Sequence, residues 1–245
     1  MNHVDLFCGA GGFGLGFKMA GFGHLYAIDM DKNAIKTYNE NIGGAECGRI
    51  EDVDDTTWFE MRDKVDVITA GFPCQPFSVA GKQEGWTDGR ADFYDSLLDI
   101  VFNTRAKFVV FENVKRFVTH DGGNSINRLV NDMENLGYNV EFKVLNSNDY
   151  DVPQKRERVI IVCNNVGVDY EFPTGTDFKP TLWDAIKNIE NKTDKGYSEL
   201  WSNAYRQIPE GGNWMDLPNE DEKKKVMRGV YKSGGGRTGF FKRLD

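Results

Sequence analysis

Residues 4 to 14 read Val-Asp-Leu-Phe-Cys-Gly-Ala-Gly-Gly-Phe-Gly, and this stretch indicates the architecture of the chain. Its apolar start predicts a buried strand, and the following segment 13–20 has apolar residues at helical spacing. Gly9, Gly11 and Gly14 fit the Gly-x-Gly-x-x-Gly pattern of a strand–turn–helix unit. Such a turn lets an adenosine-containing ligand approach the backbone closely, so the stretch predicts a ligand-binding turn at the start of an α/β sheet.

Strand-like apolar runs and amphipathic helical segments alternate along the rest of the chain. We expect strands at 4–7, 25–29, 65–70, 108–111, 140–145 and 159–163. We expect helices at 13–20, 32–41, 94–103 and 125–136. This alternation predicts an α/β fold with a mostly parallel, Rossmann-like, doubly wound sheet that is covered by helices on both faces.

The composition fits a cytoplasmic globular protein. A length of 245 residues with 40% hydrophobic content allows one large α/β domain, or one domain with a small appendage. No apolar run could span a bilayer, and the apparent strand that begins directly after Met1 leaves no room for a signal peptide. We therefore expect a cytoplasmic location and no membrane partner.

Charge and cysteine content restrict the partners. The four cysteines lack zinc-ligand spacing, so we expect no metal site. The net charge of −8 argues weakly against extensive contact with nucleic-acid phosphates, although basic clusters occur at 154–158 and 236–243.

An acidic residue stands where a ribose would be held. Asp29 ends the second expected strand twenty residues after Gly9, at a position where a carboxylate accepts hydrogen bonds from sugar hydroxyls. Dinucleotides and S-adenosylmethionine both carry an adenosine, so the turn and Asp29 leave both cofactors open.

Chemistry-bearing residues stand at three further strand ends. Gly-Phe-Pro-Cys-Gln at 71–75 follows the third strand, Glu112 follows the fourth, and Gln-Lys-Arg-Glu-Arg at 154–158 precedes the last. The carboxyl ends of parallel strands lie at one edge of a sheet, where ligands bind. The segment 154–158 comes close to that edge only if the last strand runs antiparallel. Taken singly, a buried cysteine, a loop acid and a solvated basic run are the ordinary interpretations.

Two segments interrupt the alternation. The polar, glycine-containing stretch 78–92 is too long for an ordinary connection and is typical of a closing lid or binding loop. From about residue 173 the alternation fades; a helix is indicated at 181–189, but the remainder has too few apolar residues to predict a second core. We expect a domain at 1–170 and an extension at 171–245.

Together these motifs resemble the DNA (cytosine-5)-methyltransferase family. The stretch 5–13 is similar to the family's first motif and 71–78 to its catalytic motif; 112–114 and 154–158 match two more, in the family's order, within residues 3–165. The resemblance implies the fold of a class I S-adenosylmethionine-dependent methyltransferase, a doubly wound mixed sheet with a partial C-terminal extension. It also implies S-adenosylmethionine as the cofactor and double-stranded DNA as the substrate, in a restriction–modification or phage system.

The resemblance assigns the catalytic residues. A thiolate from Cys74 would add to C6 of cytosine and make C5 nucleophilic toward a methyl group. Glu112 would protonate N3 of the cytosine or donate a hydrogen bond to it. Arg158 would hold O2 and position Glu112, and Arg156 belongs to the same set of catalytic residues. The target base must be flipped out of the duplex. Contacts to DNA would come from Gln75, Ser78, Lys82 and Arg90.

The resemblance also implies a cofactor set. Its members line the turn, the second strand end and the entrance to the catalytic segment: Phe7, Gly9, Ala10, Gly11, Gly12, Asp29, Met30, Ile50, Pro73 and Phe93. One departure is Gly48-Arg49-Ile50 where the family often has Gly-Asp-Ile, because an arginine cannot accept a hydrogen bond from the adenine amino group. Glu51 or Asp52 could accept it instead.

The C-terminal part departs further from the family. The stretches 208–214 and 235–241 resemble the approach to the target-recognition region, but the sequence stops at Asp245, before the family's last two motifs. Three explanations fit: the larger subunit of a split enzyme completed by a second subunit, a truncated form, or a cofactor-binding remnant without activity. A tRNA cytosine-5 methyltransferase is a further alternative. We expect little or no DNA methylation by this chain alone.

Overall fold

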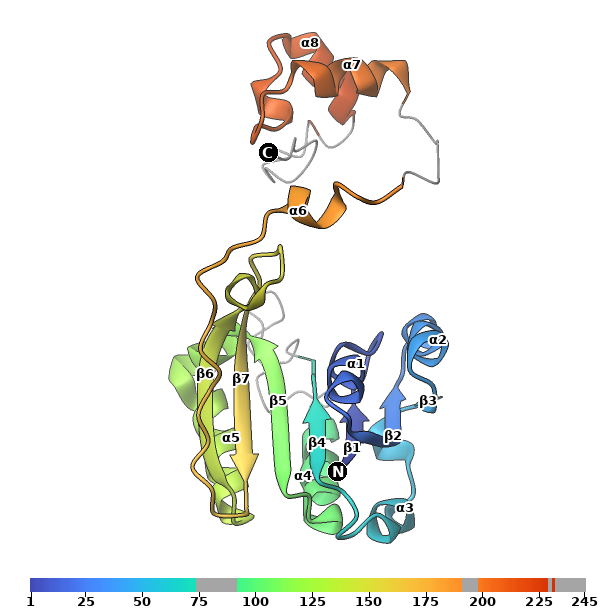
Figure 1. Ribbon diagram of the computed structural model, residues 1–245, viewed down its shortest axis with the longest axis vertical. Helices are drawn as coiled ribbons and strands as arrows, with labels where there is room; N and C mark the ends of the chain where they lie inside the picture. Colours follow the sequence, from blue (N-terminus) through green and yellow to red (C-terminus); the bar gives the residue numbers. More distant parts are fainter. Residues whose placement is uncertain (74–91, 191–197, 229–230, 232–245) are drawn as a thin grey trace. The chain divides into compact units, whose positions relative to one another are not determined.

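The computed structural model describes residues 1–73, 92–190, 198–228 and 231 (Figure 1). Five predicted site residues lie outside the described residues: Cys74, Gln75, Ser78, Lys82 and Arg90. The chain divides into two compact units, each of which is described by itself. The first comprises 1–146 and 156–175, and the second 147–155 and 176–245.

A mixed sheet forms the centre of the first unit (Figure 1). In the described residues it has seven strands in the order β3-β2-β1-β4-β5-β7-β6. The strands are β1 (Asn2–Leu6), β2 (Gly23–Asp29), β3 (Ala45–Cys47), β4 (Val67–Ala70), β5 (Phe108–Val114), β6 (Asn139–Asn146) and β7 (Glu157–Asn164). The pairings from β3 through β5 are parallel, whereas β7 runs antiparallel to both β5 and β6. The expected doubly wound mixed sheet is confirmed.

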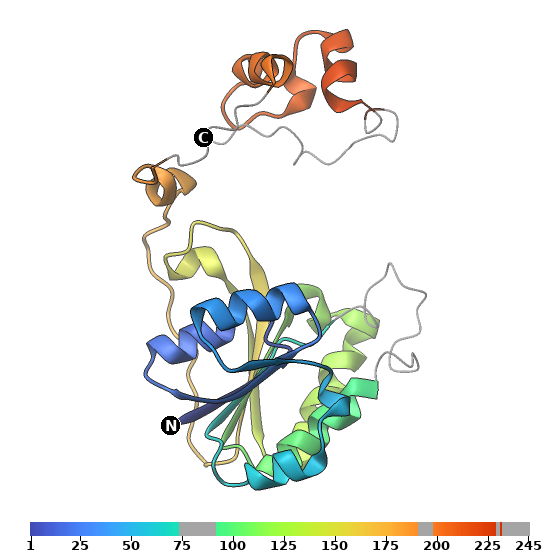
Figure 2. The same ribbon diagram turned by 90° about the vertical axis from the view of Figure 1, so that its right-hand side faces the viewer.

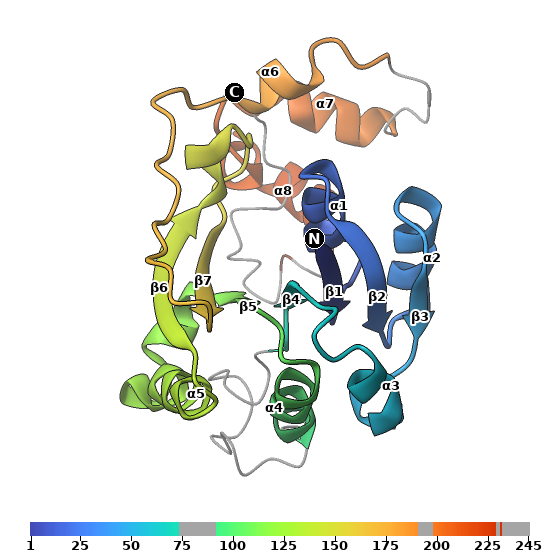
Figure 3. The ribbon, with the colours of Figure 1, turned by 60° about the horizontal axis from the view of Figure 1, so that its bottom comes forward.

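Helices cover both faces of this sheet (Figures 2 and 3). One face carries α1 (Gly12–Met19) and α2 (Lys32–Asn41). The other carries α3 (Asp55–Glu60), α4 (Asp92–Thr104) and α5 (Asn124–Asn135). Short 3-10 turns are η1 (Ile50–Asp52), η5 (Lys115–Val118) and η6 (His120–Gly123). The sequence did not predict β3 and α3, because three and six residues are too few to show a period.

The core follows the alternation of side chains along the strands. In β2, Tyr26 and Ile28 pack into the main apolar cluster, on the face covered by α3, α4 and α5. Ala27, between them, joins a smaller cluster with Ile35 and Tyr38 of α2. Successive strand residues point to opposite faces, so a strand buried on both sides reads as a continuous apolar run.

Gly14 allows α1 and α2 to approach closely. A Cβ added at Gly14 would lie 2.3 Å from the hydroxyl oxygen of Tyr38, a fully buried ring. Gly16, one half-turn along α1, has open space at the same position.

We expect Gly14→Ala and Gly16→Ala to change stability in opposite directions. Alanine is favoured over glycine in a helix by about 1 kcal/mol. At Gly14 this gain is outweighed by overpacking against Tyr38, which costs about 1–3 kcal/mol. Urea unfolding should show Gly16→Ala above and Gly14→Ala below the parent protein. Equal stabilisation by both would contradict the close approach.

The second unit contains short helices and its own apolar cluster. Its elements are η7 (Ser147–Tyr150), α6 (Leu182–Ile186), α7 (Glu199–Gln207), η8 (Trp214–Asp216) and α8 (Glu220–Met227). The helix indicated at 181–189 is confirmed as α6. The expectation that the tail forms no second core is wrong, because six buried residues pack together: Ala204, Ile208, Trp214, Leu217, Val226 and Met227. They come from three short elements and the residues directly after two of them, so no single helical period reveals them.

Candidate active site

The glycine turn after β1 adopts backbone conformations that favour glycine. Gly9 and Gly11 have φ values of 53° and 99°, and Phe7 takes φ 52° in the same left-handed region. A Cβ on Gly11 would also lie 2.5 Å from Cδ1 of Ile42. Both the conformation and the lack of space therefore require glycine at position 11. Phe7 carries a Cβ and is therefore strained at its φ value. Strained non-glycine residues of this kind concentrate at ligand-binding sites.

The turn presents open backbone beside a carboxylate. A Cβ built on Gly9 or Gly12 meets no atom of the described residues within 4 Å, and Ala10 is exposed. Asp29 Oδ2 accepts a hydrogen bond from the Gly9 N–H at 2.9 Å, and Oδ1 accepts one from the Asp31 N–H at 2.8 Å. A carboxylate has about four acceptor sites. Each oxygen of Asp29 therefore keeps acceptor capacity for a sugar hydroxyl, and the arrangement fits an adenosine-containing cofactor.

Of the other predicted cofactor residues, Phe93 and Ile50 are buried, whereas Met30 and Pro73 are exposed. The ring of Phe93, which is buried in α4, makes an edge-to-face contact with Phe7, with the centroids 5.3 Å apart. Met30 is 73% exposed directly after Asp29, as expected of a side chain left free to cover a ligand. Ile50 is buried in the main core, and Pro73 is exposed.

The departure at Arg49 has a local partner. Its Nη2 lies 2.7 Å from Oε1 of Glu51, whose side chain is largely buried. An acidic group is thus held next to the position where the family often has aspartate. A hydrogen bond from the adenine amino group to Glu51 or Asp52 stays a prediction.

A buried polar network, which the sequence analysis missed, lies behind the turn. The Thr69 hydroxyl donates to Asp5 Oδ1 at 2.6 Å, and His3 Nε2 lies 2.8 Å from the same hydroxyl. All three side chains are buried. Burial raises the pKa of Asp5 to about 7, with the Thr69 hydrogen bond opposing the shift, and burial lowers the pKa of His3 to about 4.

We expect Asp5→Asn to change the pH dependence of stability. The pKa of Asp5 rises from 3.8 to about 7 on folding, so the neutral carboxyl contributes stability below pH 3.8 that is lost as the pH rises through 7. His3 acts oppositely, because its lowered pKa removes stability as the pH falls from 6.5 to 4. Asparagine cannot ionise. The unfolding free energy of Asp5→Asn minus that of the parent should therefore rise by up to about 4 kcal/mol from low to high pH.

Urea unfolding of the parent and of Asp5→Asn at about pH 4.5 and about pH 8 checks this. The two proteins share every other titrating group, so the difference between them isolates Asp5. A difference that does not vary with pH would contradict the raised pKa.

The strand ends that carry the predicted catalytic residues, here called the catalytic edge, bring Glu112 and two arginines together. In the antiparallel pairing of β5 with β7, Glu112 lies opposite Ile160 and Val114 opposite Arg158. Glu112 and Arg158 are therefore diagonal neighbours on one face. Arg158 Nε lies 2.7 Å from Glu112 Oε1, and Arg156 Nη2 lies 3.6 Å from the same oxygen. The condition set in the sequence analysis, that the last strand runs antiparallel, is met.

The guanidinium of Arg158 is held at two points. Besides the contact of Nε with Glu112, its Nη1 donates to the carbonyl of Glu157 at 2.8 Å. The side chains of Glu112 and Arg158 are each about three-quarters buried. This leaves the pair fixed in orientation and still reachable by a ligand.

Strand β5 also holds the segment that leads to Cys74. The side-chain amide of Asn113, which is buried, donates to the carbonyl of Phe72 at 3.4 Å. Pro73 follows, and Cys74 itself lies outside the described residues. Asn113 was part of a matched motif, but the sequence gave it no role.

The cofactor turn and the catalytic edge meet at Gly71. A Cβ built there would lie 3.8 Å from the carbonyl oxygen of Phe7 and 4.0 Å from Glu112 Oε2. The two groups of predicted residues therefore form one site at the carboxyl ends of β1, β4 and β5, where ligands bind in open α/β sheets.

Within the described ranges, no cluster of His, Cys, Asp or Glu side chains is suited to a metal ion. Among the helices of those same ranges, none has the length and apolar character needed to cross a membrane.

Curated proteins resemble this chain along nearly its whole length. The type II methyltransferase M.Eco47II of Escherichia coli is 35% identical over 255 residues, which cover 99% of this chain and 60% of that protein. M.PspPI of Psychrobacter sp. is 36% identical, with 99% of this chain and 61% of the relative covered. M.HhaI of Haemophilus parahaemolyticus is 39% identical over 71% of this chain and 53% of its own length. This chain therefore spans about 60% of the length of the first two relatives.

Solved structures share the fold. A putative DNA modification methyltransferase encoded within an E. coli prophage aligns with a TM-score of 0.65 and 22% identity, covering 92% of this chain and 68% of its own. The Entamoeba histolytica methyltransferase EhMeth aligns with a TM-score of 0.66 and 16% identity, covering 85% and 67%. The C-5 cytosine-specific DNA methylase family matches residues 1–237. Because that match covers almost the entire sequence, this chain belongs to the C-5 cytosine-specific DNA methylase family.

Proposed function

We propose that this chain carries the catalytic centre of a DNA (cytosine-5)-methyltransferase that acts on double-stranded DNA with S-adenosylmethionine as cofactor. The observation that carries the proposal is the 2.7 Å contact between Glu112 and Arg158 at the same sheet edge as the Asp29–Gly9 turn. A carboxyl group that contacts one nitrogen of a guanidinium, with further guanidinium donors beside it, suits a pyrimidine, whose N3 and O2 are adjacent. The named relatives are type II methyltransferases, which supports a restriction–modification setting in the cytoplasm.

The reaction follows from the residue types. The Cys74 thiolate adds to C6 of a flipped cytosine, forming a C–S bond and moving the ring electrons toward C5, while Glu112 donates a hydrogen bond or proton at N3. Bound S-adenosylmethionine supplies an electrophilic methyl group, which C5 takes. A base then removes the C5 proton, the C–S bond breaks, and Cys74 leaves as the thiolate, restoring the aromatic ring. S-adenosylhomocysteine is the second product.

The cofactor would be held by the predicted residues of the glycine turn and of the end of β2. Asp29 would accept hydrogen bonds from the ribose, and the open backbone at Gly9 and Gly12 would face the methionine end. Phe7, Met30 and Phe93 would supply apolar contacts. The remaining members of the set are Ala10, Gly11, Ile50 and Pro73.

Recognition of DNA is the part of the proposal that reaches beyond the described residues. Gln75, Ser78, Lys82 and Arg90 remain predicted DNA contacts. This chain covers about 60% of the length of M.Eco47II. We propose that sequence recognition depends on the remainder of that length, supplied in a second subunit or in further residues.

Two measurements test the function. Calorimetric titration should show binding of S-adenosylmethionine and none of NAD; tighter binding of NAD would refute the proposal. Radiolabelled methyl transfer should then be assayed on duplex DNA and on tRNA, with this chain alone and with a second polypeptide that corresponds to the part of M.Eco47II that this chain does not cover. We expect the label to appear in duplex DNA, and only when the second polypeptide is present. Label in tRNA but not in DNA would assign the chain to the tRNA enzymes.

A further inference from the structure

The loop that joins β6 to β7 belongs to the second compact unit. Residues 147–155 group with 176–245, although both strands that the loop connects belong to the first unit. The loop ends directly before Arg156, so one peptide bond separates it from a residue that contacts Glu112. The loop is therefore linked covalently to a residue of the Glu112 cluster.

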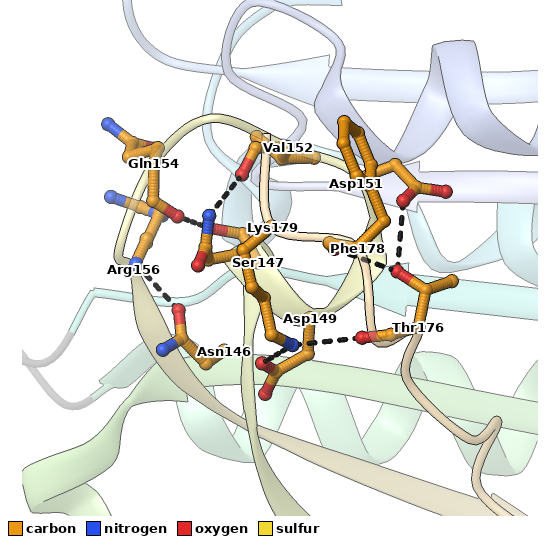
Figure 4. Close-up of polar contacts among 11 residues, drawn as sticks. Asn146, Ser147, Asp149, Asp151, Val152, Gln154, Arg156, Thr176, Phe178 and Lys179 are labelled. Carbon is orange, nitrogen blue, oxygen red and sulfur yellow. Dashed lines mark hydrogen bonds and ion pairs between the residues drawn. The ribbon is translucent and has the colours of Figure 1, made fainter. Parts of the chain in front are cut away.

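A short segment, residues 176–179, holds the loop through several polar contacts (Figure 4). Lys179 Nζ lies 2.5 Å from Asp149 Oδ1, and the Thr176 N–H donates to the Asp149 carbonyl at 2.8 Å. The Thr176 hydroxyl donates to Asp151 Oδ1 at 2.9 Å. An exposed ion pair alone contributes little. Here the ion pair and one hydrogen bond act on Asp149, and a second hydrogen bond acts on Asp151, so the contacts restrain the loop together.

The loop transmits this restraint because it is bonded internally. The Ser147 hydroxyl donates to the Gln154 carbonyl at 2.5 Å, and the Asn148 side-chain amide donates to the Val152 carbonyl at 3.3 Å (Figure 4). At its base, Asn146 Oδ1 accepts the backbone N–H of Arg156 at 3.1 Å. These bonds close the loop in successive rungs, and the covalent chain links them to the held residues and to the first arginine.

We propose that Thr176 and Lys179 are positioning residues for Arg156 and Arg158, acting through Asp149, Asp151 and the bonded loop. The inference rests on the proposed function, which gives the two arginines their role beside Glu112. It differs from that function in assigning a task to side chains that touch neither cytosine nor cofactor. When residues 176–179 release the loop, Arg156 and then Arg158 lose their fixed approach to Glu112.

The test is the double variant Thr176→Val/Lys179→Met in the full chain. Nuclear magnetic resonance should show hydrogen exchange at the Arg156 backbone N–H and the Arg158 Nε–H accelerated by about tenfold, because the opening of these bonds becomes easier. Lys187→Met is the matched control. It removes a comparably exposed pair, Lys187–Asp184 at 3.1 Å, which joins α6 to the residue that follows it. The control should leave both exchange rates within about twofold.

Two further readouts separate positioning from general damage. Calorimetry should show that the double variant binds S-adenosylmethionine with unchanged affinity. The single variant Lys179→Arg, which keeps Thr176 and the charge next to Asp149, should show the slow exchange of the parent. Exchange rates equal to those of the parent, or an equal acceleration in Lys187→Met, would overturn the inference. Exchange does not depend on methyl transfer, so a failure of the proposed function would leave this result readable. If methyl transfer is detected, its single-turnover rate should be lower in the double variant, in which hydrogen exchange is faster.

Discussion

Replacing Glu112 by glutamine should slow single-turnover methyl transfer by about 100- to 10,000-fold, the range typical of a lost general acid. Glutamine keeps the size of the side chain but cannot transfer a proton to N3. It also loses the charge that pairs with Arg158 Nε at 2.7 Å. Affinity for S-adenosylmethionine should stay unchanged, because the proposed ribose contact is made by Asp29.

Glu157→Gln is the matched control for this experiment. Glu157 lies on the neighbouring strand β7, where its exposed carboxylate pairs with Lys115 at 2.9 Å. Its removal should alter the rate by less than about threefold, as expected for a surface ion pair. Equal effects of the two substitutions would mean that Glu112 contributes only charge to the region, and its catalytic role would be rejected.

Replacing Arg158 by methionine should slow methyl transfer by about 100- to 1,000-fold, the cost of removing one donor that stabilises a transition state. The substitution removes the proposed hydrogen bonds to cytosine O2 and leaves Glu112 without its nearest cation. Arg158→Lys should recover little, because an ammonium cannot contact Glu112 and O2 with the geometry of a fork. Single-turnover rates at saturating DNA measure both variants.

Arg128→Met provides the comparison. Arg128 forms an ion pair with Asp132 at 3.5 Å on α5, in the same compact unit. Loss of this arginine should leave the rate within about threefold, consistent with an exposed helix pair. Full recovery by Arg158→Lys would show that charge alone suffices and would contradict the proposed contact with O2.

The sequence predicted the parts of the site that rest on local patterns. Gly9 and Gly11 form the turn because their φ values follow from a strand–turn–helix unit of consecutive residues. Asp29 and Glu112 were placed because each stands where an apolar run ends. The contact of Glu112 with Arg158 depended on the direction of β7, a non-local property that the sequence could state only as a condition.

Other features escaped because their partners are far apart in the chain or their elements are short. Thr69 reaches Asp5 across 64 positions, and only the polar residues at 3 and 5 of a buried strand hinted at a network. The hold of Thr176 and Lys179 on the loop joins residues 25 to 30 positions apart in a region without periodicity. The apolar cluster around Trp214 is assembled from helices too brief to predict.

Duplex DNA that carries 5-fluorocytosine at the target site gives the decisive measurement. Fluorine at C5 cannot be removed as a proton, so the C–S bond to C6 cannot break after methyl transfer. With S-adenosylmethionine and the second polypeptide present, intact-mass analysis should show this chain covalently joined to DNA, and Cys74→Ser should show no adduct. An adduct that persists in Cys74→Ser, or none in the parent chain under conditions where unmodified DNA is methylated, would contradict Cys74 as the nucleophile.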